Sequence, residues 1–486
     1  MADKLYEEKL EQIKFLEDNG INPYPCEPPK RTHKNNLVVS SFDELNGEEV
    51  DVVGRITGKR GHGKLIFLDL EDESGKVQVM IKADKVGENQ IDIFKKGFGI
   101  GDFVGINGTV FKTIAGEVSI DTNSFVMLAK SLLPVPPKRT REKDAISDPE
   151  LRARQRYLDM IAHPEVIERF KTRSKMVQFM RNRFLELGCI EMETPILDWI
   201  YGGANARPFD THHNALDLDL FLRISNELYL KKLMIGGMEG VFEFSRDFRN
   251  EGIDKTHNPE FTQVEVYKAY TDYIYMMEMM ENLIADMAKE LLGKTKINYQ
   301  GMEIELAAPW KRLSIYDGLK ETMKFDVEKI SKEELLAIAK KEGIEETDEG
   351  HILCELFDKY VQPTLINPTF VIDWPESTSP LAKIHRSKKG LVERFECHVG
   401  KTEIANCYTE LNDSRKQRAN FEAEMKRNTE GDKEAMPNDE DFIVAMEYGM
   451  PPAGGIGIAI DRWAMIFTDA EHIRDVLTFP LMKPLK

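Results

Sequence analysis

Phe248-Arg249-Asn250-Glu251-Gly252 and, a few residues later, His257-Asn258-Pro259-Glu260-Phe261 make up the stretch that decides the fold. The run from Val241 to Phe248 predicts a strand before this stretch, and a second strand is expected from Phe261 to Tyr267. We expect Arg249 and Glu251 to share a face on the first strand. Alternation in the second strand puts four side chains on one face: Phe261, Gln263, Glu265 and Tyr267.

This predicted hairpin carries an arginine, carboxylates, a histidine and aromatic rings. The combination suits a nucleotide, because arginine binds phosphate, an aromatic ring stacks on a base, and a glutamate accepts a hydrogen bond from an amine. Spacing alone leaves one alternative open, which is a surface hairpin with ordinary cross-strand charge pairs.

A second informative stretch is Gly454-Gly455-Ile456-Gly457-Ile458-Ala459-Ile460-Asp461-Arg462. Its isoleucines fall on one strand face, which we expect to enter the core, and Gly455, Gly457 and Ala459 fall on the other. Such small residues let a flat ligand approach the backbone closely. A Rossmann loop also contains a G-x-G run, but its glycines open a helix straight after a strand, whereas here Asp461 and Arg462 enter the helix.

Two glutamates that are distant in the sequence are candidates for one acidic pocket. Glu227 begins a predicted helix. In a later strand, Asn406, Tyr408 and Glu410 share a face. With Tyr267 as an aromatic wall, the two glutamates would select a cationic side chain. Each charge-assisted hydrogen bond contributes roughly 1.5–3 kcal/mol, and a neutral ligand would leave buried carboxylates unpaired at a cost of about 3–5 kcal/mol.

A second carboxylate pair flanks a predicted turn at Gly400. Glu396 and Glu403, brought together by this hairpin, could hold Mg²⁺ through oxygen ligands, and the alternative is two solvated glutamates. Strict alternation would place Glu403 on the opposite face from Asn406. For both to serve one pocket, a bulge is needed near Ala405.

The chain changes character along its length. Five short strands between Val50 and Leu133, with a helical interruption, predict an OB-type barrel, and another small β-barrel is the alternative. Pro134–Arg139 predicts an extended linker. A long amphipathic helix follows from Pro164 to Leu187, and mixed strands and helices follow it, with a helical insert at about 326–365.

Bulk properties fit a globular protein without a membrane span. The chain has 486 residues, which is long enough for two or three domains. Its N-terminus is charged and has no secretory signal, and its five scattered cysteines argue against disulfides and a structural zinc site. The net charge of -18 alone speaks against nucleic-acid binding, but 11 basic and 7 acidic residues between Lys138 and Lys175 give that stretch a local charge of +4.

The hairpin stretch resembles motif 2 of the class II aminoacyl-tRNA synthetases, and the glycine-rich stretch resembles motif 3. The long helix ending at Gly188, with Cys189–Pro195 after it, resembles motif 1, which forms the dimer interface in that family. The resemblance implies that Arg249 holds the α-phosphate of ATP, Glu251 contacts the adenine amine, Phe261 and Arg462 cover the two faces of adenine, and His257 lies near the terminal phosphates. It also adds Glu403 to this ATP site.

From Gly20-Ile21-Asn22-Pro23-Tyr24-Pro25 to Phe479-Pro480-Leu481-Met482 the chain is similar to the lysyl-tRNA synthetases. The loop Gly202–Phe209 matches the loop that closes over the amino acid in that family, which usually carries glycine at the position of Ala459. The resemblance implies the lysine-binding residues Gly203, Glu227, Glu265, Tyr267, Asn406, Tyr408 and Glu410. It implies the anticodon contacts Arg60, Phe67, Gln78 and Glu117. Phe67 would stack on a base, and the alternative is a core strand residue.

These observations predict an α+β protein in two parts. Residues 1–145 are expected to form an N-terminal helix and an OB-type anticodon-binding barrel, and residues 146–486 a class II catalytic domain with an antiparallel sheet flanked by helices. The resemblance implies that a cytoplasmic homodimer joins L-lysine to tRNA(Lys) using ATP and Mg²⁺, with Arg249 and Arg462 as catalytic residues. Aspartyl- and asparaginyl-tRNA synthetases share this plan, but the acidic pair argues against them. A non-catalytic paralogue is expected to have lost motif residues that this chain retains.

Overall fold

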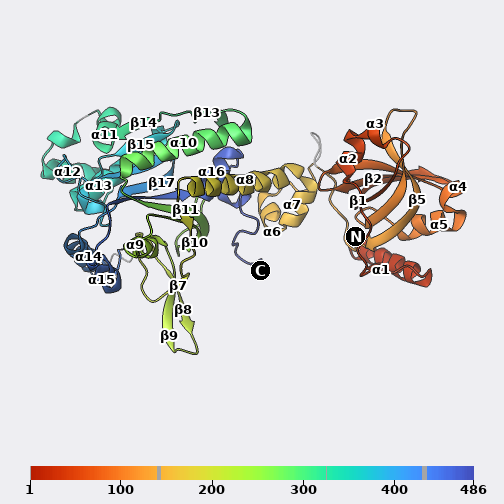
Figure 1. Ribbon diagram of the computed structural model, residues 1–486, viewed down its shortest axis with the longest axis horizontal. Coiled ribbons are helices and arrows are strands. Elements are labelled where there is room, and N and C mark those ends of the chain that lie inside the picture. Colours follow the sequence, from red (N-terminus) through yellow and green to blue (C-terminus); the bar gives the residue numbers. More distant parts are fainter. Residues whose placement is uncertain (1, 139–143, 325, 430–434, 486) are drawn as a thin grey trace. The chain divides into compact units, whose positions relative to one another are not determined.

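The structure, a computed structural model, describes residues 2–138, 144–324, 326–429 and 435–485. The chain forms two compact units (Figure 1). Residues 1–152 with 157–164 are called the barrel unit here, and residues 153–156 with 165–486 the sheet unit. Arg139, the end of the predicted linker, and part of the basic stretch lie at 139–143, outside the described residues. Among the described residues, no helix is long and apolar enough to cross a membrane.

The barrel unit contains a closed five-stranded barrel in the order β1-β2-β3-β5-β4, as predicted. Residues in β2 alternate between core and outer face, so that Leu68 is buried while Phe67 and Asp69 are only partly covered. The strands are β1 (Glu49–His62), β2 (Leu65–Asp72), β3 (Gly75–Lys82), β4 (Phe103–Lys112) and β5 (Val118–Ala129). The helices are α1 (Ala2–Asp18), α2 (Asn35–Ser40), α3 (Phe42–Leu45), α4 (Ala83–Val86) and α5 (Glu88–Gly97).

The sheet unit is built on an eight-stranded sheet in the order β14-β15-β16-β17-β18-β11-β10-β6. Its six inner strands pair antiparallel, as predicted, and the two edge strands β14 and β6 pair parallel to their neighbours. The strands are β6 (Ile190–Glu191), β10 (Gly240–Phe248), β11 (Glu260–Ala269), β14 (Lys311–Ser314), β15 (Thr369–Ile372), β16 (Arg394–Val399), β17 (Thr402–Thr409) and β18 (Ala453–Ala459).

Three helices share an apolar core with this sheet, and they are α8 (Pro164–Glu186), α10 (Tyr273–Leu292) and α16 (Ile460–Phe467). Met180 of α8 and Trp463 of α16 are fully buried there. Ile456 and Ile458 of β18 enter the same core, as the alternation predicts. One sheet face is therefore apolar and covered, which leaves the opposite face for polar side chains.

Because β14 and β15 are parallel, the chain between them makes a crossover, and here it is helical. This crossover contains the helical insert predicted at about 326–365. The crossover begins before that range, with α11 (Ile315–Met323). Ser331 caps α12 (Lys332–Glu342) in a reciprocal pair of hydrogen bonds with Glu334.

The remaining helices are α6 (Pro149–Arg154), α7 (Arg156–Ala162), α9 (Glu227–Ile235), α13 (Glu349–Tyr360), α14 (Ser414–Thr429) and α15 (Glu440–Glu447). The remaining strands are β7 (Leu197–Asp198), β8 (Phe209–His213), β9 (Leu218–Leu222), β12 (Lys296–Tyr299) and β13 (Met302–Glu305).

Candidate active site

A cavity of about 410 Å³ lies on the polar face of the eight-stranded sheet. Strands β11, β18 and β17 supply its floor, and loops at 203–205, 249–258 and 378–381 supply its rim. Among the candidate ATP-, lysine- and metal-binding residues, only Glu410 does not line this cavity. The residues that do are Gly203, Glu227, Arg249, Glu251, His257, Phe261, Glu265, Tyr267, Glu396, Glu403, Asn406, Tyr408 and Arg462.

The pairing of the three floor strands aligns the candidate residues in rows. Glu265 and Asn406 both pair with Gly457, and Tyr267 and Tyr408 both pair with Gly455. Each glycine therefore lies between two functional side chains from the neighbouring strands. The small face predicted for β18 is the floor of the cavity, and it leaves room above the backbone for a ligand.

A β-bulge brings Glu403 to the cavity. Cys397 pairs with Ala405 and His398 with Glu403, so Ile404 is an extra residue on β17. This extra residue reverses the alternation between Glu403 and Asn406, and both side chains line the cavity. The bulge lies beside Ala405, which is where we predicted one if Glu403 and Asn406 serve the same pocket.

Arg249 and Glu251 lie in the loop after β10, which ends at Phe248, so the expectation that both share a strand face is wrong. The strand ends at Phe248 and a loop begins, because Asn250 and Gly252 are turn-forming residues. Arg249 remains directed by its neighbours. Its Nε donates to the carbonyl oxygen of Ile224 at 3.4 Å, and its guanidinium lies 5.1 Å from the ring centroid of Phe261.

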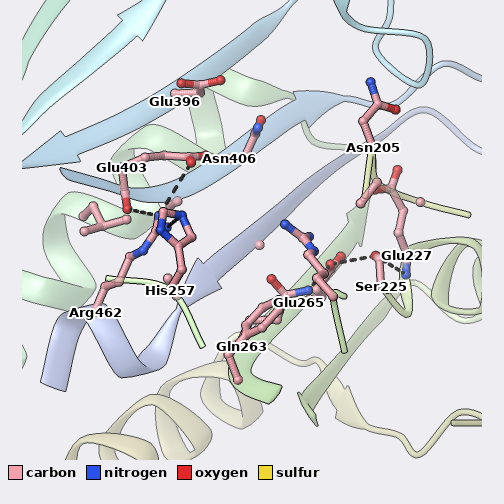
Figure 2. A pocket seen from close by; sticks show the side chains of 18 of the residues that line it. Asn205, Ser225, Glu227, His257, Gln263, Glu265, Glu396, Glu403, Asn406 and Arg462 are labelled. Atoms are coloured by element: carbon pink, nitrogen blue, oxygen red, sulfur yellow. Dashed lines mark hydrogen bonds and ion pairs between the residues drawn. The ribbon is translucent and has the colours of Figure 1, made fainter. Parts of the chain in front are cut away.

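Arg462, near the start of α16, contacts two other candidate residues (Figure 2). Its Nη1 donates to the carbonyl oxygen of Glu403 at 2.6 Å, and its Nη2 lies 3.0 Å from Nε2 of His257. Nδ1 of His257 lies 2.8 Å from a carboxylate oxygen of Asp254. Hydrogen bonds from the Thr256 amide and from His257 outweigh burial and lower the pKa of Asp254 to about 2. One end of the cavity thus gathers residues assigned to ATP.

The other end is acidic. Glu265 accepts hydrogen bonds from Ser225 at 3.1 Å, from Gln263 at 2.9 Å and from the hydroxyl of Tyr267 at 2.5 Å. Figure 2 shows Ser225 between Glu265 and Glu227. Burial, followed by the nearby charge of Glu227, raises the pKa of Glu265 to about 8. A buried carboxyl of this kind gains from a cationic partner.

Glu410 lies behind this end of the cavity and is fully buried. Its Oε2 lies 2.5 Å from Nζ of Lys231, which also forms an ion pair with Glu227. Burial raises the pKa of Glu410 to about 8 although the charge of Lys231 opposes that shift. The two glutamates expected to meet a substrate cation therefore already share a cation that belongs to the chain itself.

Glu396 and Glu403 both line the cavity. Arg394 holds one carboxylate oxygen of Glu396, and Nε2 of His398 lies 3.1 Å from the other. Burial opposes ionisation of Glu396, but Arg394 and His398 keep its pKa below the ordinary value. Burial together with the charges of Glu396 and Glu403 raises the pKa of Asp358 to about 7, so the local field is negative.

This donor chemistry fits a hard divalent cation, because such a cation prefers carboxylate oxygens. The described residues contain no cluster of three or more His, Cys, Asp or Glu side chains placed to hold a metal. A cation at Glu396 and Glu403 would therefore take its other ligands from water or from a phosphate.

Several cavity residues escaped the sequence reasoning. Lys231 was missed, although its spacing of four from Glu227 on a helix was a usable signal. Arg394 shares a strand face with Glu396, and that alternation could have indicated it. Gln263 was placed on the correct face but given no role; its amide nitrogen also donates to Asp247 at 2.6 Å. Asn205 lies in the loop Gly202–Phe209, which the resemblance had indicated, whereas the sequence offered no signal for Ser225, Thr378 and Ser379.

Three of the four candidate anticodon residues lie on adjacent strands of the barrel. Arg60 on β1 pairs with Phe67 on β2, and Gln78 lies on β3 opposite Asp69. Phe67 lies on the outer face and is absent from the barrel core, so the core alternative for it is wrong. Glu117 lies before β5. The hydroxyl of Ser119 donates to Gln78 at 2.9 Å and to the carbonyl oxygen of Glu117 at 3.3 Å, which links these two candidates.

Comparison with known proteins agrees with this architecture. Residues 148–483 match the family described as tRNA synthetases class II (D, K and N). Residues 50–128 match the family described as OB-fold nucleic acid binding domain. A lysine–tRNA ligase of Clostridium perfringens is 46% identical over 98% of this chain and 96% of its own length. Lysine–tRNA ligases of Clostridium tetani and Clostridium botulinum are 46% and 45% identical, each over 99% of this chain and 96% of its own length.

The family match covers more than half of the chain, and the relatives match nearly all of it. The barrel and the antiparallel sheet with its small-residue floor are the two parts that these matches identify. The chain therefore belongs to the class II tRNA synthetases, in the lysine–tRNA ligase family.

Proposed function

We propose that this chain is a lysine–tRNA ligase that activates L-lysine with ATP to lysyl-adenylate and pyrophosphate, and then transfers lysine to the 3'-terminal adenosine of tRNA(Lys). One observation carries the proposal, which is that a single cavity has an arginine-lined end and a buried acidic end. Arginine recognises phosphate, and paired buried carboxylates recognise an ammonium. The lysine–tRNA ligase relatives support the same substrate. We propose a cytoplasmic location, because a role in translation fits that compartment.

The acidic end takes the side chain of lysine in this proposal. Glu227 and Glu410 accept from its ε-ammonium, and Tyr267 and Tyr408 flank its methylene chain. Glu265, Asn406 and the backbone of Gly203 hold the amino-acid end. Gly203 has φ +82°, which favours glycine, and a Cβ there would lie 2.9 Å from Oγ of Ser225.

The arginine end takes ATP. Arg249 holds the α-phosphate, Glu251 accepts from the adenine amine, and Phe261 and Arg462 cover the two faces of the base. His257 and Glu403 lie toward the terminal phosphates. Mg²⁺ held by Glu396 and Glu403 would neutralise phosphate charge. Arg249 and Arg462 are the residues that we assign to catalysis, because they meet the charge that develops on phosphorus.

The reaction takes place in two displacement steps. An oxygen of the lysine carboxylate attacks the α-phosphorus, and the bond from that phosphorus to the pyrophosphate oxygen breaks. A terminal ribose hydroxyl of tRNA then attacks the activated carbonyl, and AMP leaves. Neither step calls for a protein base, so orientation and charge stabilisation by this cavity supply the acceleration.

Outside this cavity, we propose that residues 1–145 bind the anticodon and residues 146–486 carry out the chemistry. Phe67 would stack on a base, and Arg60, Gln78 and Glu117 would read base edges on the same surface. The outward position of Phe67 and its pairing with Arg60 support this assignment.

We also propose a homodimer through the motif 1 region. Large apolar side chains are exposed there, including Leu185, Ile190 and Trp199. Exposed apolar side chains of this size mark interaction surfaces. Ile190→Glu should yield a monomer by light scattering. Ile114→Glu, at a fully exposed position between β4 and β5, should not change the mass.

Amino-acid-dependent ATP–pyrophosphate exchange tests the function, with all twenty amino acids screened without tRNA. We expect exchange with lysine alone. Exchange with aspartate or asparagine instead would keep the chemistry and overturn the assignment of the acidic end. Absence of exchange from folded protein supplied with Mg²⁺ would favour a non-catalytic paralogue.

A further inference from the structure

Lys231 is a buried cation inside the acidic end of the cavity. It lies one helical turn after Glu227 on α9, and only 1% of its surface is exposed. Its ammonium forms ion pairs with Glu227 and Glu410. The next residue, Lys232, is directed outward and pairs with Asp441 at the surface at 2.6 Å. Lys231 therefore joins two carboxylates that come from distant parts of the chain.

The groups around this cluster leave a surplus of negative charge. Glu265, Tyr267 and Tyr408 face it from β11 and β17, and Asp247 lies behind Glu265 on β10. Asp247 lies 3.1 Å from Arg223, a cation that it shares with Glu243 of the same strand. Three carboxylates, Glu227, Glu265 and Glu410, then remain against the single ammonium of Lys231.

The hydrogen bonds within the cluster are unevenly distributed. Glu265 accepts three, as described above. Oε1 of Glu410 is buried, and no hydrogen-bond partner for it exists among the described residues. A buried acceptor without a partner is costly, so a ligand that supplies a donor there is favoured.

Removal of the Lys231 charge would place Glu227 and Glu410 side by side with no counter-ion. Like charges that close cannot both ionise, so one carboxyl would take up a proton. Burial raises the pKa of Glu227 even with Lys231 present. Burial would lower the pKa of Lys231, but Glu227 and Glu410 outweigh it, and that pKa lies above its ordinary value. Lys231 therefore opposes the effect of burial on Glu227 and Glu410, although the pKa values of both carboxyls stay above the ordinary value.

We propose that Lys231 is a positioning residue that sets amino-acid specificity: it holds the carboxyls of Glu227 and Glu410 together and makes their negative charge less costly, so that this end of the cavity accepts one further ammonium, that of the substrate. The inference rests on the proposed function. It also has a direct rival, because a second positive charge could simply repel lysine. Under the rival, removal of Lys231 would tighten lysine binding.

The test compares Lys231→Met with Lys232→Met, a matched change one residue away on the same helix. The readouts are the lysine and ATP KM values in pyrophosphate exchange and lysine binding by calorimetry. A nearby opposite charge lowers a carboxyl pKa by about 1–3 units, so its loss should weaken lysine binding by about 10- to 1000-fold near neutral pH. ATP KM should not change. Unchanged or tighter lysine binding by folded Lys231→Met would overturn the proposal.

The pH profile separates a charge effect from a packing effect. The pKa of Glu410 is about 8 in the unchanged protein and should lie higher in Lys231→Met, so the fall of lysine KM with rising pH should shift to higher pH in the variant. A packing defect would raise lysine KM by the same factor at every pH, and that result would contradict the proposal.

A double variant covers the case in which Lys231→Met does not fold. Lys231→Met with Glu227→Gln removes one charge of each sign and keeps the net charge of the cluster. Recovery of folding, with lysine KM close to that of Glu227→Gln alone, would support the charge role. A double variant that also fails to fold would show that the volume of Lys231 is what matters, and the proposal would fail.

The experiments distinguish a failure of the proposed function from a failure of the role of Lys231. If the unchanged protein gives no lysine-dependent exchange, the function is wrong and Lys231 has no specificity to set. If the unchanged protein is active with lysine and Lys231→Met has the same lysine KM, only the role of Lys231 is wrong.

Discussion

The carboxylate of Glu410 lies against the backbone of Gly455. A Cβ on Gly455 would stand 2.1 Å from Oε1 of Glu410 and 2.3 Å from Cε1 of Tyr267. Neither side chain has room to move, because both are buried. At Gly457, the next small residue of the floor, a Cβ would lie 3.7 Å from the Glu265 carboxylate, which is ordinary contact. The two glycines therefore have different reasons to be glycine.

Gly455→Ala should disrupt the acidic end from below. Overpacking of this kind costs about 1–3 kcal/mol of stability. We expect lower thermal stability and weak lysine binding, with ATP binding retained. Gly457→Ala should keep its thermal stability, because its Cβ enters the cavity without striking protein atoms. Equal melting temperatures for the two variants would contradict this distinction.

Arg249→Ala should remove most adenylate formation and leave the fold intact. Removal of one donor to a developing charge lowers kcat by about 10²- to 10³-fold in other enzymes. Arg246→Ala is the matched control, since Arg246 lies near the end of β10, three residues before Arg249, and pairs with Glu260 at the surface. Single-turnover adenylate formation measures both. Near-normal activation by a folded Arg249→Ala protein would remove Arg249 from the mechanism.

Glu410→Gln should chiefly weaken lysine binding. A charge-assisted hydrogen bond contributes roughly 1.5–3 kcal/mol, which corresponds to about 10- to 150-fold in lysine KM. ATP KM should stay the same because Glu410 lies at the other end of the cavity. Glu447→Gln, which changes a surface partner of Arg418, serves as control. An unchanged lysine KM would refute contact between Glu410 and the substrate ammonium.

The raised pKa values of Glu265 and Glu410 predict how pH affects stability. Both lie at about 8, above the ordinary 4.5, so each carboxyl stabilises the fold when protonated. That contribution is present at low pH and is lost as pH rises through about 8. Each group should lower the unfolding free energy by about 1.4 kcal/mol per pH unit between these values.

Lysine should offset this loss, because its ammonium stabilises the ionised carboxylates. The rise in melting temperature that lysine causes should therefore be larger at about pH 8.5 than at about pH 6. Differential scanning calorimetry with and without lysine measures it. The same rise at both pH values would show that these carboxyls do not change ionisation on binding.

Much of this site could be predicted from the sequence because strand alternation is a strong constraint. Alternation placed Glu265 beside Tyr267, and it required a bulge between Glu403 and Asn406, which lies at Ile404. The same rule failed at Arg249, because it assumed that the strand continued past Phe248. Alternation has no meaning where a loop begins.

The parts that could not be predicted depend on contacts between distant elements. A buried lysine is rare, and the sequence reasoning gave Lys231 no role. Only the fold brings Glu410 to α9 and gives Lys231 its second partner. The position of Glu410 behind Gly455 likewise depends on how β17 and β18 pair. These contacts determine the charge of the pocket, and they cannot be predicted from local sequence patterns.

Phe67→Ala should separate tRNA recognition from amino-acid activation. Phe67 lies on the outer face of the barrel, where an unpaired base could stack on it, and such stacking contributes about 1–3 kcal/mol per base. We expect a higher tRNA KM in aminoacylation and unchanged lysine-dependent pyrophosphate exchange, because the cavity is not altered. Phe103→Ala is the matched control, since Phe103 is also a partly exposed aromatic of the barrel but contacts Arg55. If both variants aminoacylate normally, Phe67 is not the stacking platform. If both lose aminoacylation equally, the defect lies in barrel stability, because only a base contact is specific to Phe67.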